Sequence, residues 1–215
     1  RLIRRQRQMC IRDRQRAKGF AAQEFVRANN IDVSMWKSGN SKMGIITAGK
    51  SYNDVREALR WLDIDEAKAK ELGICIYKVG MPWPLEPRGV REFCEGLDTV
   101  LVVEEKRELI EHQVKWQLYN WKESVRPTVI GKQDEYGSWL LPPENDLPLQ
   151  TIVEAISTRL HKITNDSELL KSLDWFKSRT EEQNNLEAPI IRKPFFCSGC
   201  PHNSSLKVPE GKRAL

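Results

Sequence analysis

The order of apolar and polar residues along the chain predicts alternating strands and helices. Four short apolar runs read as strands, and the third, "TVLVV", is apolar almost throughout, as in strands covered on both faces. The runs are "MGIITAG", "ICIYKV", "TVLVVEE" and "RPTVIGK". Between them, Val55, Ala58, Leu59 and Leu62 recur at helical spacing. This alternation predicts an α/β fold: an open, mostly parallel sheet with helices on both sides.

Caps and breakers set the expected ends of these helices. We expect Ser51 to cap the first helix, Gly73 to end the second, and Pro87 and Gly96 to bound the third. Beyond Asp134 the pattern loosens, although "LQTIVEAISTRL" still forms an apolar helical face and "DSELLKSLDWFKSRTEEQ" reads as a connecting helix. The sequence therefore predicts a tail at 1–16, an α/β domain at 17–160, a helical connector at 161–192, and the start of a second domain at 193–215.

Composition narrows the class of protein. The chain is 40% hydrophobic and 30% charged, which is typical of a soluble protein with a real core. Its longest apolar runs are about five or six residues, against the roughly 18 that cross a bilayer, so we expect no membrane span. Cys75 and Cys94 lie in apolar patterns and no secretory leader is evident, so we expect free thiols and a cytoplasmic location.

The positive charge is confined to one end. Residues 1–16 hold seven arginines and one aspartate, a net +6 against +5 for the whole chain, so the rest is nearly neutral. The stretch "RQMCIRDRQ" also resembles one reading frame of a common sequencing adapter. We therefore interpret residues 1–16 as a translation artefact and leave them out of the fold. Without them, nothing in the charge favours nucleic acid as a partner.

One motif resembles a nucleotide-binding loop. Gly44-x-x-x-x-Gly49-Lys50-Ser51 fits the phosphate-binding P-loop pattern letter for letter. A P-loop needs a strand that ends at its first glycine, whereas here a polar turn precedes Gly44 and the apolar run is the interval itself. We therefore predict that residues 45–47 are a strand, and that Lys50 is a solvated lysine at the start of a helix.

Two acidic residues follow the third strand. Glu104 and Glu105 stand where α/β proteins often place their chemistry, as metal ligands or as acid and base. No histidine or aspartate is spaced to help them, so we favour hydrogen-bond acceptors at a subunit or domain interface. Trp83, between two prolines, is either the wall of a pocket or a packing anchor.

The most chemical stretch is "FFCSGCPHN". Cys197 and Cys200 form a C-x-x-C pair, and His202 adds a third soft ligand. Zinc takes four ligands and a cubane iron–sulfur cluster normally four cysteines, so the pair is incomplete. A redox role and a metal site completed from elsewhere both stay open on the residues alone.

Five segments together resemble the long, fused form of indolepyruvate ferredoxin oxidoreductase, a thiamine-diphosphate-dependent 2-oxoacid oxidoreductase. The resemblance runs from about Gly19 to Leu215 and depends on the combination of motifs. The segments are "GIITAGKSYNDVREAL", "LGICIYKVGMPWPLEPRGVREF", "LDTVLVVEEKRELIEHQVKWQLYNW", "RPTVIGKQDEYGSWLLPPENDL" and "FFCSGCPHNSSLKVPEGKRAL".

This resemblance implies a transketolase C-terminal-like α/β domain followed by the first turns of a thiamine-diphosphate-binding domain. It implies oxidative decarboxylation of an arylpyruvate to an acyl-CoA, with ferredoxin as electron acceptor. The implied cofactors are thiamine diphosphate with Mg²⁺ and [4Fe–4S] clusters. The implied partners are coenzyme A, the 2-oxoacid substrate, the remaining domains of the enzyme and a second copy in a homodimer.

The resemblance carries over to few residues. Cys197 and Cys200 match a pair of cluster ligands, and His202 and Asn203 would line the thiamine diphosphate region. The G-D-G...N motif and the activating glutamate fall outside these residues, so we expect no catalytic residue here and an inactive isolated chain. "CPHNSSL" and "PEGKRAL" depart from the usual "CPHNTST" and "PEGSRAL". The alternative is a small α/β interaction module with a zinc-binding C-x-x-C-P-H tail.

Overall fold

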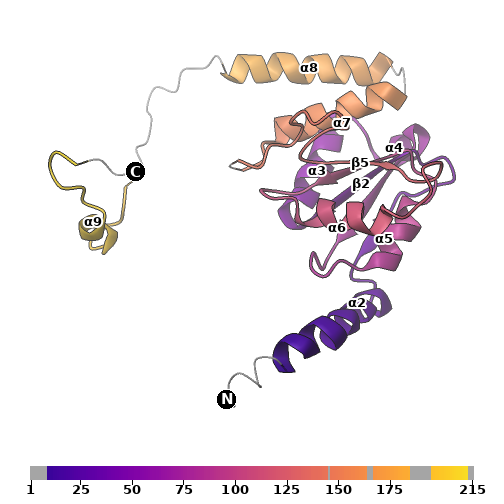
Figure 1. Ribbon diagram of the computed structural model, residues 1–215. Helices are drawn as coiled ribbons and strands as arrows, with labels where there is room; N and C mark the ends of the chain where they lie inside the picture. The colour runs from indigo at the N-terminus through magenta and orange to yellow at the C-terminus, as the bar shows by residue number, and fades with distance from the viewer. Residues whose placement is uncertain (1–8, 145, 164–166, 185–194, 213–215) are drawn as a thin grey trace. The chain divides into compact units, whose positions relative to one another are not determined.

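The computed structural model describes residues 9–144, 146–163, 167–184 and 195–212, and it divides the chain into two compact parts, residues 1–180 and 181–215. The larger part holds a five-stranded sheet with helices on both faces (Figure 1). Its elements are η1 (Arg14–Lys18), α2 (Gly19–Ala28), β1 (Val33–Met35), β2 (Met43–Ala48), α3 (Gly49–Trp61), α4 (Glu66–Leu72), β3 (Ile74–Val79), α5 (Pro87–Cys94), β4 (Thr99–Val103), α6 (Leu109–Leu118), β5 (Thr128–Ile130), α7 (Leu149–Ile163) and α8 (Ser167–Asn184).

The predicted parallel α/β sheet is confirmed. Its order is β1-β3-β2-β4-β5, and β2 runs parallel to both of its neighbours. Only β1 is antiparallel, pairing Val33 with Lys78 at the edge of the sheet. The sequence pattern gives no sign of β1, which is three residues long and partly exposed.

Each face of the sheet carries its own core. Alternate strand residues such as Ile45 and Leu101 pack with α3, α4 and α7, and the intervening ones such as Ile46 and Val102 pack with α5 and α6. This follows from the two-residue period of a strand, which sends successive side chains to opposite faces. Phe176 of α8 joins the first core, and its ring lies 5.6 Å from that of Trp61.

One of the predicted helix ends needs correction. The first helix begins at Gly49, so Ser51 is a buried residue inside α3 and not its cap. The third helix ends at Cys94, and Gly96 follows its C-cap in the left-handed conformation with φ 77°, which confirms that prediction. Two other signals are confirmed: Gly73 ends α4 in the left-handed conformation with φ 75°, and Pro87 is the first residue of α5.

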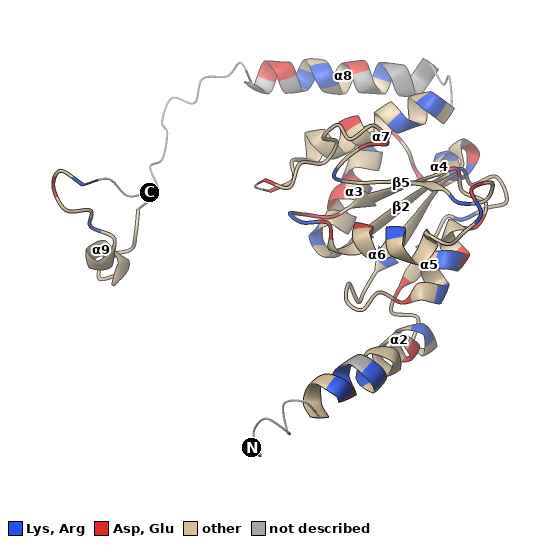
Figure 2. Cartoon of the chain, viewed as in Figure 1, with Lys and Arg blue, Asp and Glu red and all other residues tan. Residues whose placement is uncertain are grey.

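Charge on this part of the chain is mixed. Figure 2 shows basic and acidic residues interspersed along the helices around the sheet. Lys18 of η1 pairs with Asp13 at 2.8 Å. Among the described residues, no helix is long and apolar enough to cross a membrane.

Gly44 is closely packed against side chains of the core that contains Ile46 and Val102. A Cβ at this position would stand 2.6 Å from Leu97 Cδ1 and 2.7 Å from Phe93 Cε1. We expect Gly44→Ala to destabilise the domain by about 1–3 kcal/mol, because overpacking forces these side chains apart. Urea unfolding measures the change. Gly39→Ala is the matched control, since a Cβ there meets nothing within 4 Å, and equal stabilities of the two variants would contradict the packing argument.

An acidic residue near α7 links stability to pH. Glu135 binds Arg159 at 2.6 Å and Lys162 at 2.8 Å, and the Lys162 hydrogen bond, with Arg159, lowers the pKa of its carboxyl to about 2. A carboxyl whose pKa is lower in the folded state than in the unfolded state stabilises the fold at pH values above its unfolded-state pKa. This stabilisation is lost as the pH falls toward the folded-state pKa. We therefore expect Glu135→Gln to cost about 1 kcal/mol at pH 6, after allowance for solvent screening, and less at pH 3.

The measurement is urea unfolding at the two pH values, with Glu144→Gln as an exposed control. A loss of stability that is the same at pH 6 and pH 3 would rule out titration of Glu135 as the cause.

Candidate functional site

The P-loop-like motif is strand and helix, as predicted. Gly44 to Ala48 belong to β2, with Ile45 opposite Ile76 on one side and Leu101 on the other. Gly49 opens α3 directly, with φ 55°. No residues are left to wrap a phosphate.

Lys50 is an exposed lysine whose ammonium group pairs with two carboxylates. Its Nζ lies 2.8 Å from Asp54 and 3.0 Å from Glu105, and these hydrogen bonds raise its pKa. We expect Lys50→Ala to leave the unfolding midpoint unchanged, since surface substitutions have small effects, and we expect neither protein to bind ATP. Calorimetric titration with MgATP is the measurement. Saturable binding that Lys50→Ala abolishes would restore the nucleotide-binding interpretation.

Glu104 caps a helix. Its carboxylate accepts hydrogen bonds from the backbone N–H groups of Leu109, Ile110 and Glu111 at 2.8–3.1 Å. These groups open α6, where backbone donors lack partners within the helix. Burial nevertheless raises the pKa of Glu104, and the three backbone hydrogen bonds oppose that shift. The expected interface acceptor is thus a cap inside one domain.

A second buried carboxylate and a buried lysine lie beside Glu104. Lys132 Nζ donates to the Glu104 carbonyl, and the Lys132 N–H donates to Glu111 at 2.9 Å. Burial lowers the pKa of Lys132, and the neighbouring carboxylates raise it. In the described part of the chain, no three His, Cys, Asp or Glu residues are grouped so as to hold a metal ion. This cluster therefore ties β4, α6 and the segment after β5 together.

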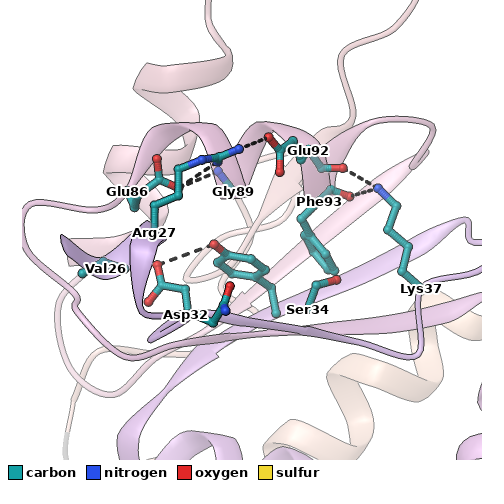
Figure 3. Close-up of a pocket in the computed structure, with 11 residues that line it drawn as sticks. Val26, Arg27, Asp32, Ser34, Lys37, Glu86, Gly89, Glu92 and Phe93 are labelled. Atoms are coloured by element: carbon teal, nitrogen blue, oxygen red, sulfur yellow. Dashed lines mark hydrogen bonds and ion pairs between the residues drawn. The ribbon is translucent and has the colours of Figure 1, made fainter. Parts of the chain in front are cut away.

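A polar pocket lies where α2, β1, β3 and α5 meet (Figure 3). Its volume is about 470 Å³. Asp32 accepts from the Gly80 N–H at 2.7 Å and faces the Tyr77 hydroxyl at 3.5 Å, and burial raises the pKa of both groups. This pocket could not be predicted from the sequence, because its acidic and aromatic groups come from separate elements.

The charged side chains of this pocket bind groups of the surrounding elements. Arg27 pairs with Glu92 at 2.6 Å, and Lys37 donates to three backbone carbonyls near the end of α5. Glu86 caps α5 by accepting from Arg88 and Gly89. These ion pairs and hydrogen bonds connect α2 and the segment after β1 to α5.

The C-x-x-C segment belongs to the smaller part of the chain, residues 181–215. The Cys200 N–H donates to the Cys197 carbonyl at 3.0 Å, so the two cysteines bound one tight turn. Asn203 Nδ2 donates to the same carbonyl at 2.9 Å, and Cys200 Sγ lies 3.2 Å from His202 Nδ1. His202 opens the short helix α9 (His202–Ser205) and stacks on Phe196 at 5.2 Å. All four predicted residues therefore share one turn.

This turn does not complete a metal site among the described residues. Cys197 is exposed and Cys200 half-buried, so both thiols are accessible, but they are two of the four thiolates that a cubane cluster takes. Two of the other cysteines have different surroundings: Cys75 and Cys94 are buried, and burial raises their pKa values to about 11 and about 12.

Sheet and cysteine turn together define an α/β domain that continues into a separate, thiol-bearing part. The family model of the indolepyruvate oxidoreductase domain matches residues 33–182, which is most of the larger part. The chain belongs to this family, as its motifs predicted.

Curated relatives agree with this assignment. The chain is 32% identical over 174 residues to indolepyruvate oxidoreductase subunit IorA of Thermococcus kodakarensis, covering 79% of this chain and 23% of the relative. With the same subunit of Pyrococcus horikoshii it shares 30% over 187 residues, covering 85% and 25%. The chain thus spans about a quarter of the length of these relatives.

Likenesses to solved structures are weaker. A split-gene transketolase, an inactive β4 tetramer, gives a TM-score of 0.42 at 17% identity over 62% of this chain and 42% of that one. A 2-oxoglutarate:ferredoxin oxidoreductase from Magnetococcus marinus gives 0.40 at 19% identity over 60% and 19%. TM-scores of this size carry no argument, so the family assignment depends on the sequence matches.

Proposed function

We propose that this chain is one part of an oxidoreductase that converts arylpyruvates to acyl-CoA and passes the electrons to ferredoxin. The observation that carries the proposal is the family match over residues 33–182, followed by the turn of Cys197 and Cys200. The curated relatives are themselves named as subunits of an indolepyruvate oxidoreductase.

The α/β domain would serve the complete enzyme as a scaffold. The polar groups near the carboxyl ends of β4 and β5 already have partners within the domain. Glu104 caps α6, and Glu111 accepts a hydrogen bond from the Lys132 N–H. We therefore assign no catalytic residue to it. The remaining domains, and a second copy in a homodimer, would supply the reacting groups, and we expect the isolated chain to be inactive and the enzyme to be cytoplasmic.

Cys197 and Cys200 would be two ligands of a [4Fe–4S] cluster, and His202 and Asn203 would lie near thiamine diphosphate. Both sulfurs flank one turn and stay accessible, as a ligand pair completed from elsewhere requires. When bound with Mg²⁺, thiamine diphosphate supplies the chemistry that removes CO₂ from a 2-oxoacid. Asn203 would hold the turn in place through its hydrogen bond to Cys197.

Metal content tests the cysteine assignment. The complete protein, purified without oxygen, is expected to contain iron and acid-labile sulfide, and replacing Cys197 and Cys200 by serine is expected to remove one cluster's share of both. Ser198→Ala is the control, since Ser198 is exposed in the same turn and carries no thiol. Iron content unchanged in the double variant would overturn the assignment. Stoichiometric zinc without iron would instead support the interaction module with a zinc-binding tail.

A further inference from the structure

The outer face of α6 carries large apolar side chains. Leu109, Trp116 and Tyr119 are 47%, 79% and 73% exposed. Their spacing of seven and three residues places them on one side of the helix, away from Ile110 and Val114, which are buried beneath it. The exposed positions of α3, by contrast, are mostly polar, as is usual for a helix that faces water. The helix α6 is therefore apolar on both sides.

Two hollows flank α6 and widen this apolar area. The first has a volume of about 590 Å³ and lies between α2, the loop before α5, and α6; the second, of about 280 Å³, lies between α6 and the start of β5. Phe20 and Trp83, which are 64% and 67% exposed, line the first hollow with Trp116, and Tyr119 lines the second. We call these four rings and the two hollows the α6 surface. Single exposed apolar residues are normal, but several large ones gathered at one place mark an interaction site.

The charged groups of the α6 surface are basic. Arg91 lines the first hollow and Arg126 the second, and the described residues that line either hollow include no Asp or Glu. Arg91 donates to the Gln117 carbonyl at 3.4 Å, and Arg126 donates to the Tyr119 carbonyl at 3.0 Å. A guanidinium has five N–H donors, so each arginine keeps donors for a further partner. The α6 surface is thus an aromatic centre with an arginine on each side.

This charge distribution disfavours pairing of the α6 surface with itself. In a symmetric dimer the same surface of both copies meets across a two-fold axis, so Arg91 and Arg126 of one copy would face those of the other. Like charges brought together at an interface cost free energy. Lys115 and His112 also line the hollows, but each already faces a carboxylate four residues earlier in the chain. The complementary surface is an apolar one surrounded by carboxylates.

The length of the curated relatives indicates where that complementary surface is found. This chain spans about a quarter of their length, so most of each relative lies outside the part that matches. We propose that the α6 surface docks another domain of the complete protein, outside these 215 residues, which presents apolar side chains ringed by Asp and Glu. The rings of Trp116 and Tyr119 pack in the centre of the contact, and Arg91 and Arg126 pair with carboxylates at its edge. The inference requires no particular reaction, so it can fail or hold independently of the proposed activity.

Hydroxyl-radical labelling read by mass spectrometry tests the proposal on the 215-residue chain and on the complete protein that contains it. We expect Trp116 and Tyr119 to be labelled at least about tenfold more slowly in the complete protein, because the core of an interface is packed like a protein interior. Replacing Arg91 and Arg126 together by Glu is expected to raise this labelling toward the rate in the 215-residue chain, since carboxylates would then face carboxylates. Arg60→Glu is the matched control: Arg60 is an exposed arginine of α3, and its reversal should leave both rings protected.

Three results would overturn the proposal. The first is equal labelling of the two rings in the 215-residue chain and in the complete protein. The second is protection in the complete protein that the double arginine reversal does not change, in a variant that circular dichroism shows to be folded. The third is a 215-residue chain that sediments as a dimer and becomes a monomer in Trp116→Ala, which would assign the α6 surface to a second copy. We expect the 215-residue chain to sediment as a monomer with and without this substitution.

Discussion

Val102→Asp is expected to leave the α/β domain unfolded at room temperature. Val102 is 1% exposed on β4, opposite Ile46 of β2, and it packs in the core beneath α5 and α6. A lone carboxylate buried there costs several kcal/mol, which is comparable to the whole stability of a domain. Loss of far-UV circular dichroism and of a cooperative urea transition is the measurement.

The matched control for this substitution is Val33→Asp. Val33 lies on the edge strand β1 and is 39% exposed, so a carboxylate there stays in water and the fold should survive. A cooperative, soluble Val102→Asp variant would mean that β4 is not a central strand, and the sheet order proposed for this domain would then be wrong.

Glu104→Ala is expected to destabilise the domain by about 2–4 kcal/mol. The substitution leaves three backbone N–H groups at the start of α6 without an acceptor, and a lost cap costs about 1 kcal/mol before the burial of those donors is counted. Urea unfolding measures the change, and amide exchange at Ile110 and Glu111 should rise with it.

Glu105→Ala is the control, because its carboxylate pairs with the exposed Lys50 and no helix depends on it. If Glu104 were instead a carboxylate reserved for a metal, removing its buried charge would stabilise the chain in the absence of metal. A Glu104→Ala variant as stable as Glu105→Ala would therefore reject the capping role.

The parallel strands could be predicted because their signal is local. Each is an apolar run whose ends are marked by glycine, proline or charge. For this reason "GIITA" reads as a strand although it lies within a P-loop pattern. The pattern itself has a packing explanation: Gly44 is where Phe93 and Leu97 approach the sheet, and Gly49 has the positive φ needed to enter α3.

Features that depend on contacts between distant segments could not be predicted. β1 exists because it pairs with β3, some forty residues later, and its own three residues are too exposed to show a strand period. The Lys132 contact with Glu111 and the Asp32–Tyr77 contact join segments 21 and 45 residues apart. The capping role of Glu104 could have been predicted, since the backbone N–H groups that donate to it begin only five residues on, at the first turn of α6.

The cysteine residues also differ in how far their surroundings could be predicted from local sequence. Their apolar surroundings predicted that Cys75 and Cys94 are buried, and the structure confirms it. For Cys197 and Cys200 the spacing predicts a shared centre, and the structure adds the turn and the Asn203 hydrogen bond that hold it. The identity of that centre depends on ligands that two thiols cannot supply, so their role as cluster ligands stays a prediction.

The most direct test of the proposed enzyme is substrate-dependent reduction of ferredoxin. The complete protein that contains this chain, loaded with thiamine diphosphate and Mg²⁺ under anaerobic conditions, is given indolepyruvate, coenzyme A and oxidised ferredoxin. The account predicts reduction of ferredoxin that requires both indolepyruvate and coenzyme A, and that is lost when Cys197 and Cys200 are replaced by serine. Ferredoxin that stays oxidised with a protein holding its full complement of cofactors would contradict it.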